Sequence, residues 1–281
     1  PGDKVADTDA CVAGVLGAGR HRCYESTAER SAGQLPGTRA LSRVLKVAQS
    51  LPLPLSMRAH TKETQASTTP AMALDFLMEG NRRFISNLKA NRDLLAQVNE
   101  TRNGQWPFAT ILSCMDSRTS AELIFDQGLG DIFSIRVAGN IVNTDVLGSL
   151  EFACGVAGSK LVVVLGHTQC GAVKGACDAV QLGNLTELLS KLQPAVYQER
   201  TVTEPEARTS KNRDFVERVA RLNVLRAVRS IIERSFVLEQ LVEEQKVGVV
   251  GGMHDLDTGA VVFYDEARVF TKADIAALRK A

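Results

Sequence analysis

The sequence predicts an α/β fold with a mostly parallel central sheet, one antiparallel edge strand, flanking helices and an N-terminal helical arm. From residue 71 onward, short apolar runs alternate with segments whose apolar residues recur at helical spacing. The run Leu161 to Leu165 is continuously apolar, as in strands buried on both faces of a parallel sheet. The last expected strand follows its predecessor through the short turn Asp257-Thr258-Gly259, which favours an antiparallel edge.

Each element follows from its local pattern. Helical spacing predicts helices over residues 71–91, 144–157, 169–181, 185–197, 215–232 and 272–279. Apolar runs predict strands over residues 108–112, 132–137, 161–165, 247–250 and 260–264. The capping box Thr119-x-x-Glu122 predicts a further helix that ends at residue 126. The pair Gly251-Gly252 is expected to end the fourth strand, which would leave His254 in a loop.

Composition excludes several classes of protein. The chain has 281 residues, of which 44% are apolar and 23% charged, so it is not a disordered, collagen-like or coiled-coil protein. Thirty-three basic and thirty-two acidic residues give no reason to expect nucleic acid as a partner. No apolar run reaches the roughly 18 residues of a membrane span. Six cysteines are too few for a disulfide scaffold at this length and favour metal binding or catalysis in a soluble protein of a reducing compartment.

The first 69 residues differ from the rest. Residues 1–69 mix small and polar residues with prolines, contain one amphipathic stretch at 40–51, and carry an arginine-rich bias after residue 20. We expect an extension that is poorly ordered, an arm on a partner subunit, or a targeting segment. The protein would then be cytoplasmic, or mitochondrial or plastidic if the extension includes a transit segment. Residues 70–281 form the expected catalytic domain.

Two segments with chemically active side chains fall where an expected strand gives way to a helix. These are Cys114-Met115-Asp116-Ser117-Arg118 and His167-Thr168-Gln169-Cys170. Ligand sites in open α/β sheets lie beyond the carboxyl ends of the strands, so two neighbouring parallel strands would bring the segments together. Two thiolates and one imidazole with a fourth position free are the ligand set of a catalytic zinc.

Asp116 and Arg118 sharpen this interpretation. A carboxylate two residues from a guanidinium can pair with it as a fork. Arg118 would keep Asp116 ionised and away from the metal, and Asp116 would orient zinc-bound water as a hydroxide nucleophile. We therefore expect one Zn²⁺ per chain, held by Cys114, His167 and Cys170.

The pattern Cys-x-Asp-x-Arg, followed about fifty residues later by His-x-x-Cys-Gly, resembles the β-class carbonic anhydrases. Other segments are similar to that family as well: Glu79 to Phe84, Arg136 to Asn140, Leu147 to Phe152, Val164 to His167 and Asp255 to Gly259. The resemblance covers residues 71–281 and implies reversible hydration of carbon dioxide to bicarbonate and a proton by a zinc-bound hydroxide. It also implies a homodimer or a tetramer built from dimers, with the substrate pocket shared across the interface.

The resemblance assigns substrate contacts to four positions. Gln105 stands nine residues before Cys114, where plant-like members have a Gln that binds the substrate, and this favours the plant-like, non-regulatory type. Phe133 and Phe152 match the aromatic positions of the pocket, and Gly171 follows the second zinc cysteine. Gln105 and Phe133 are expected to serve the zinc of the neighbouring subunit. Departures from the family pattern are Phe152 for a Tyr, Ala138 for a Val and Val137 for an Asn.

Two other functions remain as alternatives. The same fold could hydrolyse a CO₂ analogue such as carbon disulfide or carbonyl sulfide, or the chain could be a non-catalytic zinc or thiol redox protein. Arg136 could be a structural ion-pair partner, for instance of Glu151, or part of the site.

Overall fold

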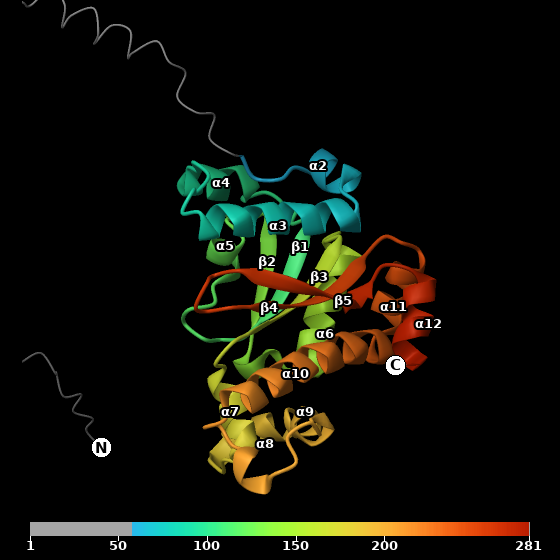
Figure 1. Ribbon diagram of the computed structural model, residues 1–281. Coiled ribbons are helices and arrows are strands. Elements are labelled where there is room, and N and C mark those ends of the chain that lie inside the picture. The colour runs from blue at the N-terminus through green and yellow to red at the C-terminus, as the bar shows by residue number, and fades with distance from the viewer. Residues whose placement is uncertain (1–57, 281) are drawn as a thin grey trace, which may run out of the picture. The chain divides into compact units, whose positions relative to one another are not determined.

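The computed structural model describes residues 58–280, and Figure 1 shows their arrangement. The amphipathic stretch at 40–51, expected to form the helical arm, lies outside the described residues. Within residues 58–280, no helix is both long and apolar enough to cross a membrane.

A five-stranded sheet forms the centre of the fold, in the order β2-β1-β3-β4-β5. The strands are β1 (Ala109–Ser113), β2 (Ile132–Arg136), β3 (Leu161–His167), β4 (Gly248–His254) and β5 (Val261–Val269). The first four are parallel, and β5 pairs antiparallel with β4 at one edge. The predicted fold class is therefore confirmed. Strands β1 and β3 are buried along their whole length, as their apolar sequences predict.

Helices cover both faces of this sheet (Figure 1). The helices of the described residues are α2 (Lys62–Ser67), α3 (Pro70–Ile85), α4 (Leu94–Thr101), α5 (Ala121–Ile124), α6 (Thr144–Glu151), α7 (Gly171–Cys177), α8 (Gly183–Ser190), α9 (Gln193–Gln198), α10 (Arg213–Arg234), α11 (Phe236–Glu243) and α12 (Lys272–Lys280). Helices α3 and α5 share one apolar cluster with the odd-numbered side chains of β3, such as Val163. Helices α6, α7 and α10 pack with Val162 and Val164 on the opposite face.

Helix α2 is fastened to the sheet layers although it lies within the expected extension. The Gln65 side chain is buried, and its amide donates to the carbonyls of Pro107 at 2.7 Å and Ala157 at 2.9 Å. The His60 N–H donates to Asp131 at 3.1 Å. Residues 58–69 therefore have specific partners in the catalytic domain.

The expected break at Gly251-Gly252 is wrong, because β4 runs through both glycines to His254. A β-carbon on Gly251 would lie 2.7 Å from Val224 of α10, and one on Gly252 would lie 3.0 Å from the Val262 carbonyl oxygen. The glycines permit close packing within the strand and do not end it. His254 consequently stands in β4, with 3% of its surface exposed, and not in a loop.

The capping box at Thr119 is also wrong. Helix α5 begins after Ser120 and has no side-chain cap. The Thr119 hydroxyl donates instead to the carbonyls of Cys114 at 3.1 Å and Asp116 at 3.0 Å. A residue that looks like a helix cap from its spacing therefore braces the segment after β1.

Several helix boundaries differ from the expectations. The first expected helix ends at Ile85, and the segment expected at 185–197 is two helices, α8 and α9, separated near Leu192. Helix α6 continues into a π-helical turn, Phe152–Val156, which ends the expected helix at nearly the expected place. Short helices α4 and α11 were not expected, because each has fewer than three turns of apolar pattern.

Candidate metal centre and active site

Two neighbouring parallel strands deliver the three candidate metal ligands to one point, as the sequence predicts. Cys114 follows β1, His167 ends β3, and Cys170 is the residue before α7. Their ligating atoms all lie within 4.8 Å of one another, and all three residues are buried. The two sulfurs are 3.9 Å apart and belong to free thiols.

The imidazole of His167 is oriented for ligation. Its Nδ1 lies 2.9 Å from the Thr168 carbonyl oxygen, so this nitrogen carries the proton and donates. Its Nε2 is buried and has no hydrogen-bond partner among residues 58–280. A buried nitrogen lone pair beside two thiols is what a soft divalent cation requires, so the donor set fits zinc.

The two thiols titrate as a pair because they are so close. Hydrogen bonds from the Cys170 thiol and, at 3.4 Å, from the Gly139 N–H lower the pKa of Cys114. The hydrogen bond with Cys114, together with burial, raises the pKa of Cys170. Cys114 is therefore the thiol of the pair that loses its proton more readily, and a metal ion would displace the proton that remains.

Gly139 is the residue that allows this contact. It adopts a left-handed conformation, with φ at 68°, and a β-carbon there would lie 2.9 Å from Leu192. Any side chain at this position would be strained and crowded, and would move the N–H away from Cys114.

Asp116 and Arg118 form the expected fork. The Arg118 Nε donates to one Asp116 oxygen at 2.9 Å, and its NH2 group donates to the other at 2.8 Å. The Arg118 backbone N–H adds a third hydrogen bond at 3.0 Å. These contacts hold the pKa of Asp116 well below its usual range, so its carboxylate stays ionised.

Arg136 braces the same segment from β2 and does not pair with Glu151. Its guanidinium donates to the carbonyls of Cys114 at 3.2 Å and Asp116 at 2.5 Å. Glu151 instead accepts from the Ser235 hydroxyl at 2.6 Å. Arg136 and Thr119 thus fix the backbone that carries both Cys114 and Asp116.

The second ligand segment is held at three points. The Thr168 N–H donates to the His254 carbonyl at 3.0 Å, and the Thr168 hydroxyl accepts from the Leu256 N–H at 2.9 Å. Gln169, in the left-handed region with φ at 57°, donates its N–H to Glu217 of α10 at 3.0 Å. The loop that carries His167 and Cys170 is therefore fixed by contacts from β4, the turn after it and α10.

His254 is a buried imidazole next to this centre. It is the in-register neighbour of His167 across β3 and β4, and within the described part of the chain neither of its ring nitrogens has a hydrogen-bond partner. Burial lowers its pKa to about 4, so the ring is neutral at physiological pH.

Of the four expected substrate-contact residues, the structure brings only Phe133 and Phe152 together. Phe133 and Phe152 line one hollow of about 570 Å³ between β2 and α6, and their ring centroids are 6.5 Å apart. None of Cys114, His167 and Cys170 lines that hollow. Gln105 is exposed and also stands outside it. Gly171 begins α7, with open space where a β-carbon would be.

Sequence reasoning missed the residues that position the ligands. Thr168 and Gln169 could have been found, because they stand between two ligands in the motif. Gly139 lies in the segment Arg136 to Asn140, which is similar to the family, but its contact with Cys114 was not expected. Glu217 could not have been found, because only the packing of α10 brings it to the centre.

Comparisons with known proteins agree with this geometry. A family model described as carbonic anhydrase matches residues 109–261, which are more than half of the chain and include the ligand cluster and the Asp116–Arg118 fork. Carbonic anhydrase 2 of Mycobacterium tuberculosis is 34% identical over 208 residues, which cover 71% of this chain and 95% of that protein. A carbonic anhydrase of Synechococcus elongatus is 31% identical over 66% of this chain and 70% of its own length.

Solved structures share the fold. A β-carbonic anhydrase of Coccomyxa has a TM-score of 0.57 and 20% identity, and the match covers 74% of this chain and 95% of that one. One of two tetrameric β-carbonic anhydrases from Sordaria macrospora has a TM-score of 0.54 and 22% identity, over 69% of this chain and 95% of that one. From the family match, the sequence identity and the shared sheet, we conclude that the chain belongs to the β-class carbonic anhydrases.

Proposed function

We propose that Cys114, His167 and Cys170 hold one Zn²⁺ per chain, and that the chain catalyses the reversible hydration of CO₂ to bicarbonate and a proton. The observation that carries this proposal is the buried, unpartnered Nε2 of His167 within 4.8 Å of two thiol sulfurs. Three protein ligands form the set that leaves a coordination position for catalysis. When bound, Zn²⁺ would supply a Lewis acid that lowers the pKa of water from about 15.7 to about 7.

Asp116 would act on the attacking water. Its carboxylate is ionised, and it would accept a hydrogen bond from that water and so orient it toward carbon dioxide. Arg118 engages both carboxylate oxygens, which keeps Asp116 from turning toward the metal. A purely structural zinc site or a thiol redox pair needs no such fork, so this contact favours the hydration reaction over a non-catalytic role.

Carbon dioxide would bind in an apolar pocket completed by a second copy of the chain. Phe133 and Phe152 already form an aromatic hollow along β2, and Gln105 and Phe133 would reach the zinc of the partner. Gly171 leaves open space beside Cys170. The presence of Gln105 supports the plant-like, non-regulatory type.

We propose a homodimer, or a tetramer built from two dimers, as the working form. Strand β2 is the edge of the sheet among the described residues, and Phe152 in the following helix is 53% exposed. The Sordaria macrospora structural neighbours are tetrameric. Within the expected extension 1–69, the part before the docked residues 58–69 would serve as an arm or a targeting segment. The free thiols support a reducing compartment, cytoplasmic or organellar.

Metal analysis combined with stopped-flow CO₂ hydration tests this function. We expect one zinc per chain and rapid hydration that is lost when zinc is removed. Parallel assays with carbon disulfide and carbonyl sulfide address the alternative hydrolase. Zinc at one per chain with no CO₂ hydration at any pH would contradict the proposal.

A further inference from the structure

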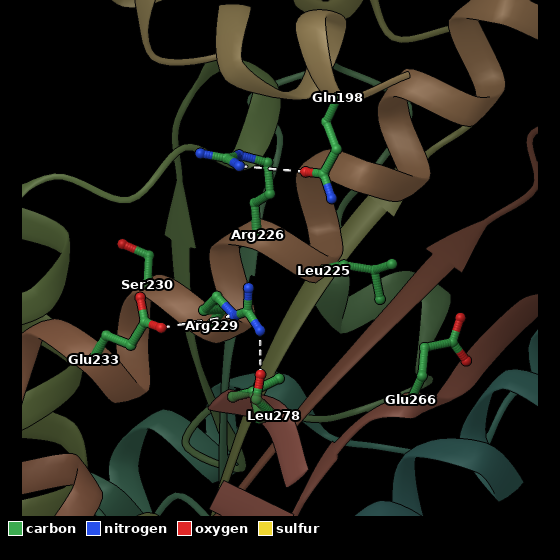
Figure 2. A pocket seen from close by; sticks show the side chains of 8 residues that line it. All are labelled: Gln198, Leu225, Arg226, Arg229, Ser230, Glu233, Glu266 and Leu278. Atoms are coloured by element: carbon green, nitrogen blue, oxygen red, sulfur yellow. Dashed lines mark hydrogen bonds and ion pairs between the residues drawn. The ribbon is translucent and has the colours of Figure 1, made fainter. Parts of the chain in front are cut away.

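Helix α10 carries several arginines, of which some contact carboxylates and others contact only neutral oxygen atoms. A hollow of about 350 Å³ lies beside this helix. Among its lining side chains, Arg229 contacts Glu233 and the Leu278 carbonyl, and Arg226 contacts Gln198 (Figure 2). Glu266, which also lines this hollow, is paired with Arg221. Arg229 and Glu233 therefore form an ion pair within this first hollow, whereas Arg226 contacts only a neutral amide there.

A second hollow of about 240 Å³ lies on the other side of Arg226 and Ser230. Its lining includes Lys191, Arg226 and Arg234 but no carboxylate. Arg226 donates to the Gln198 amide oxygen at 3.3 Å, and Arg234 donates to the Val142 carbonyl at 3.2 Å. Neither guanidinium has a carboxylate partner among residues 58–280. The positive charge around this hollow is thus only partly compensated, by Glu187, which lies 2.9 Å from Lys191.

Neutral donors complete the lining. The Ser230 hydroxyl lies 3.4 Å from the Arg234 guanidinium. Asn223 is 94% buried, since 6% of its surface is exposed, and its amide donates to the Gly139 carbonyl at 2.9 Å. Two uncompensated guanidiniums, one ammonium and a hydroxyl around a small concavity match the oxygens of a tetrahedral anion.

We propose that this hollow is a binding site for a phosphate group, held by Arg226, Arg234 and Lys191 with Ser230 as a hydrogen-bond partner. Three cations, less the charge of Glu187, leave about two positive charges, which a phosphate dianion would neutralise. Bicarbonate carries one charge and would fit this balance less well. The site is distinct from the zinc ligands, because none of them lines the hollow.

Isothermal titration calorimetry of the zinc-loaded protein with inorganic phosphate tests the proposal. The test variant is Arg226→Gln. The matched control is Arg218→Gln, which removes one positive charge from the same helix at an exposed side chain that contacts Thr201 at 2.6 Å and lies outside the hollow. We expect phosphate to bind the wild type, binding to weaken by roughly tenfold or more in Arg226→Gln, and the control to match the wild type. Phosphate bound at the zinc would be unaffected by either change, so the two sites are told apart.

Additional measurements identify the ligand and check that the variants are folded. Arg234→Gln should weaken phosphate binding as Arg226→Gln does, and circular dichroism should show that both variants are folded. Glycerol phosphate in place of inorganic phosphate distinguishes an ester from the free ion, and bicarbonate should bind more weakly than either. Equal affinity in the wild type, Arg226→Gln and Arg234→Gln, equal losses in Arg218→Gln, or no phosphate binding at millimolar concentration would overturn the proposal.

Discussion

Asp116 is held by three hydrogen bonds from a single residue, Arg118. In Asp116→Asn, the amide keeps the shape of the side chain but loses its charge and one acceptor oxygen. Zinc content should remain at one per chain, because Asp116 is not a ligand in this account. The value of kcat/KM for CO₂ hydration should fall by about 100-fold or more, the usual effect of removing a group that acts on the reacting proton. Full activity in this variant would contradict the role of the fork.

Thr168 positions His167 through its own backbone. The carbonyl of Thr168 orients the imidazole, and its hydroxyl accepts from the Leu256 N–H. Thr168→Val keeps the branched shape and removes this acceptor, whereas Thr168→Ser keeps the acceptor. We expect the valine variant to bind zinc about 10-fold to 100-fold more weakly in a chelator competition, as loss of a contact behind a ligand does elsewhere.

The serine variant is the control and should retain nearly the wild-type zinc affinity. If valine and serine weaken zinc binding equally, the hydroxyl is not what holds the segment.

The metal ligands themselves could be predicted from sequence, because they lie in two short motifs, each of which follows an expected strand. The support from Glu217 could not be predicted, since Glu217 reaches the centre only through the packing of α10.

At the scale of elements, alternation of strands and helices predicted all five strands and the antiparallel edge. Two expectations were wrong for different reasons. Gly251 does not end its strand, because it permits close packing against Val224 of α10, a tertiary contact that a local pattern does not report. Thr119 does not cap a helix, because its hydroxyl donates to the carbonyls of Cys114 and Asp116 in the turn that precedes it.

The packing of α10 on β4 gives a stability prediction. In Gly251→Val, the new side chain would meet Val224 and Ala267, since even a β-carbon lies within 2.9 Å of both. Overpacking of this kind costs about 1 to 3 kcal/mol, so the melting temperature should drop by several degrees. The control is Gly155→Ala, where the added β-carbon would have an ordinary 3.6 Å contact with Val237. A melting temperature unchanged by Gly251→Val would show that α10 does not approach β4 this closely.

At the scale of the whole molecule, the hollow beside β2 is expected to be covered by a second copy. Phe152→Glu places a charge on a side chain that is 53% exposed in the single chain and buried in the proposed dimer. Sedimentation velocity should show dissociation toward monomer, and CO₂ hydration should fall with it, because the pocket would lose the residues of the partner. The control is Tyr197→Glu, on α9, which is 70% exposed and lies outside this hollow.

Unchanged assembly in Phe152→Glu would place the interface elsewhere. Assembly could be expected from sequence only through family resemblance, because an exposed aromatic residue inside an apolar helical pattern looks the same as a core residue. The structure separates Phe152 from its buried neighbours and identifies it as a surface group.

X-ray absorption spectroscopy at the zinc edge of the purified protein shows directly which atoms bind the metal. We expect one zinc per chain with two sulfur ligands at about 2.3 Å, one imidazole nitrogen at about 2.0 Å, and one exchangeable light-atom ligand. Cys170→Ser should remove one sulfur from this set and weaken zinc binding. A zinc ion surrounded by four permanent protein ligands, or by no sulfur, would contradict the account.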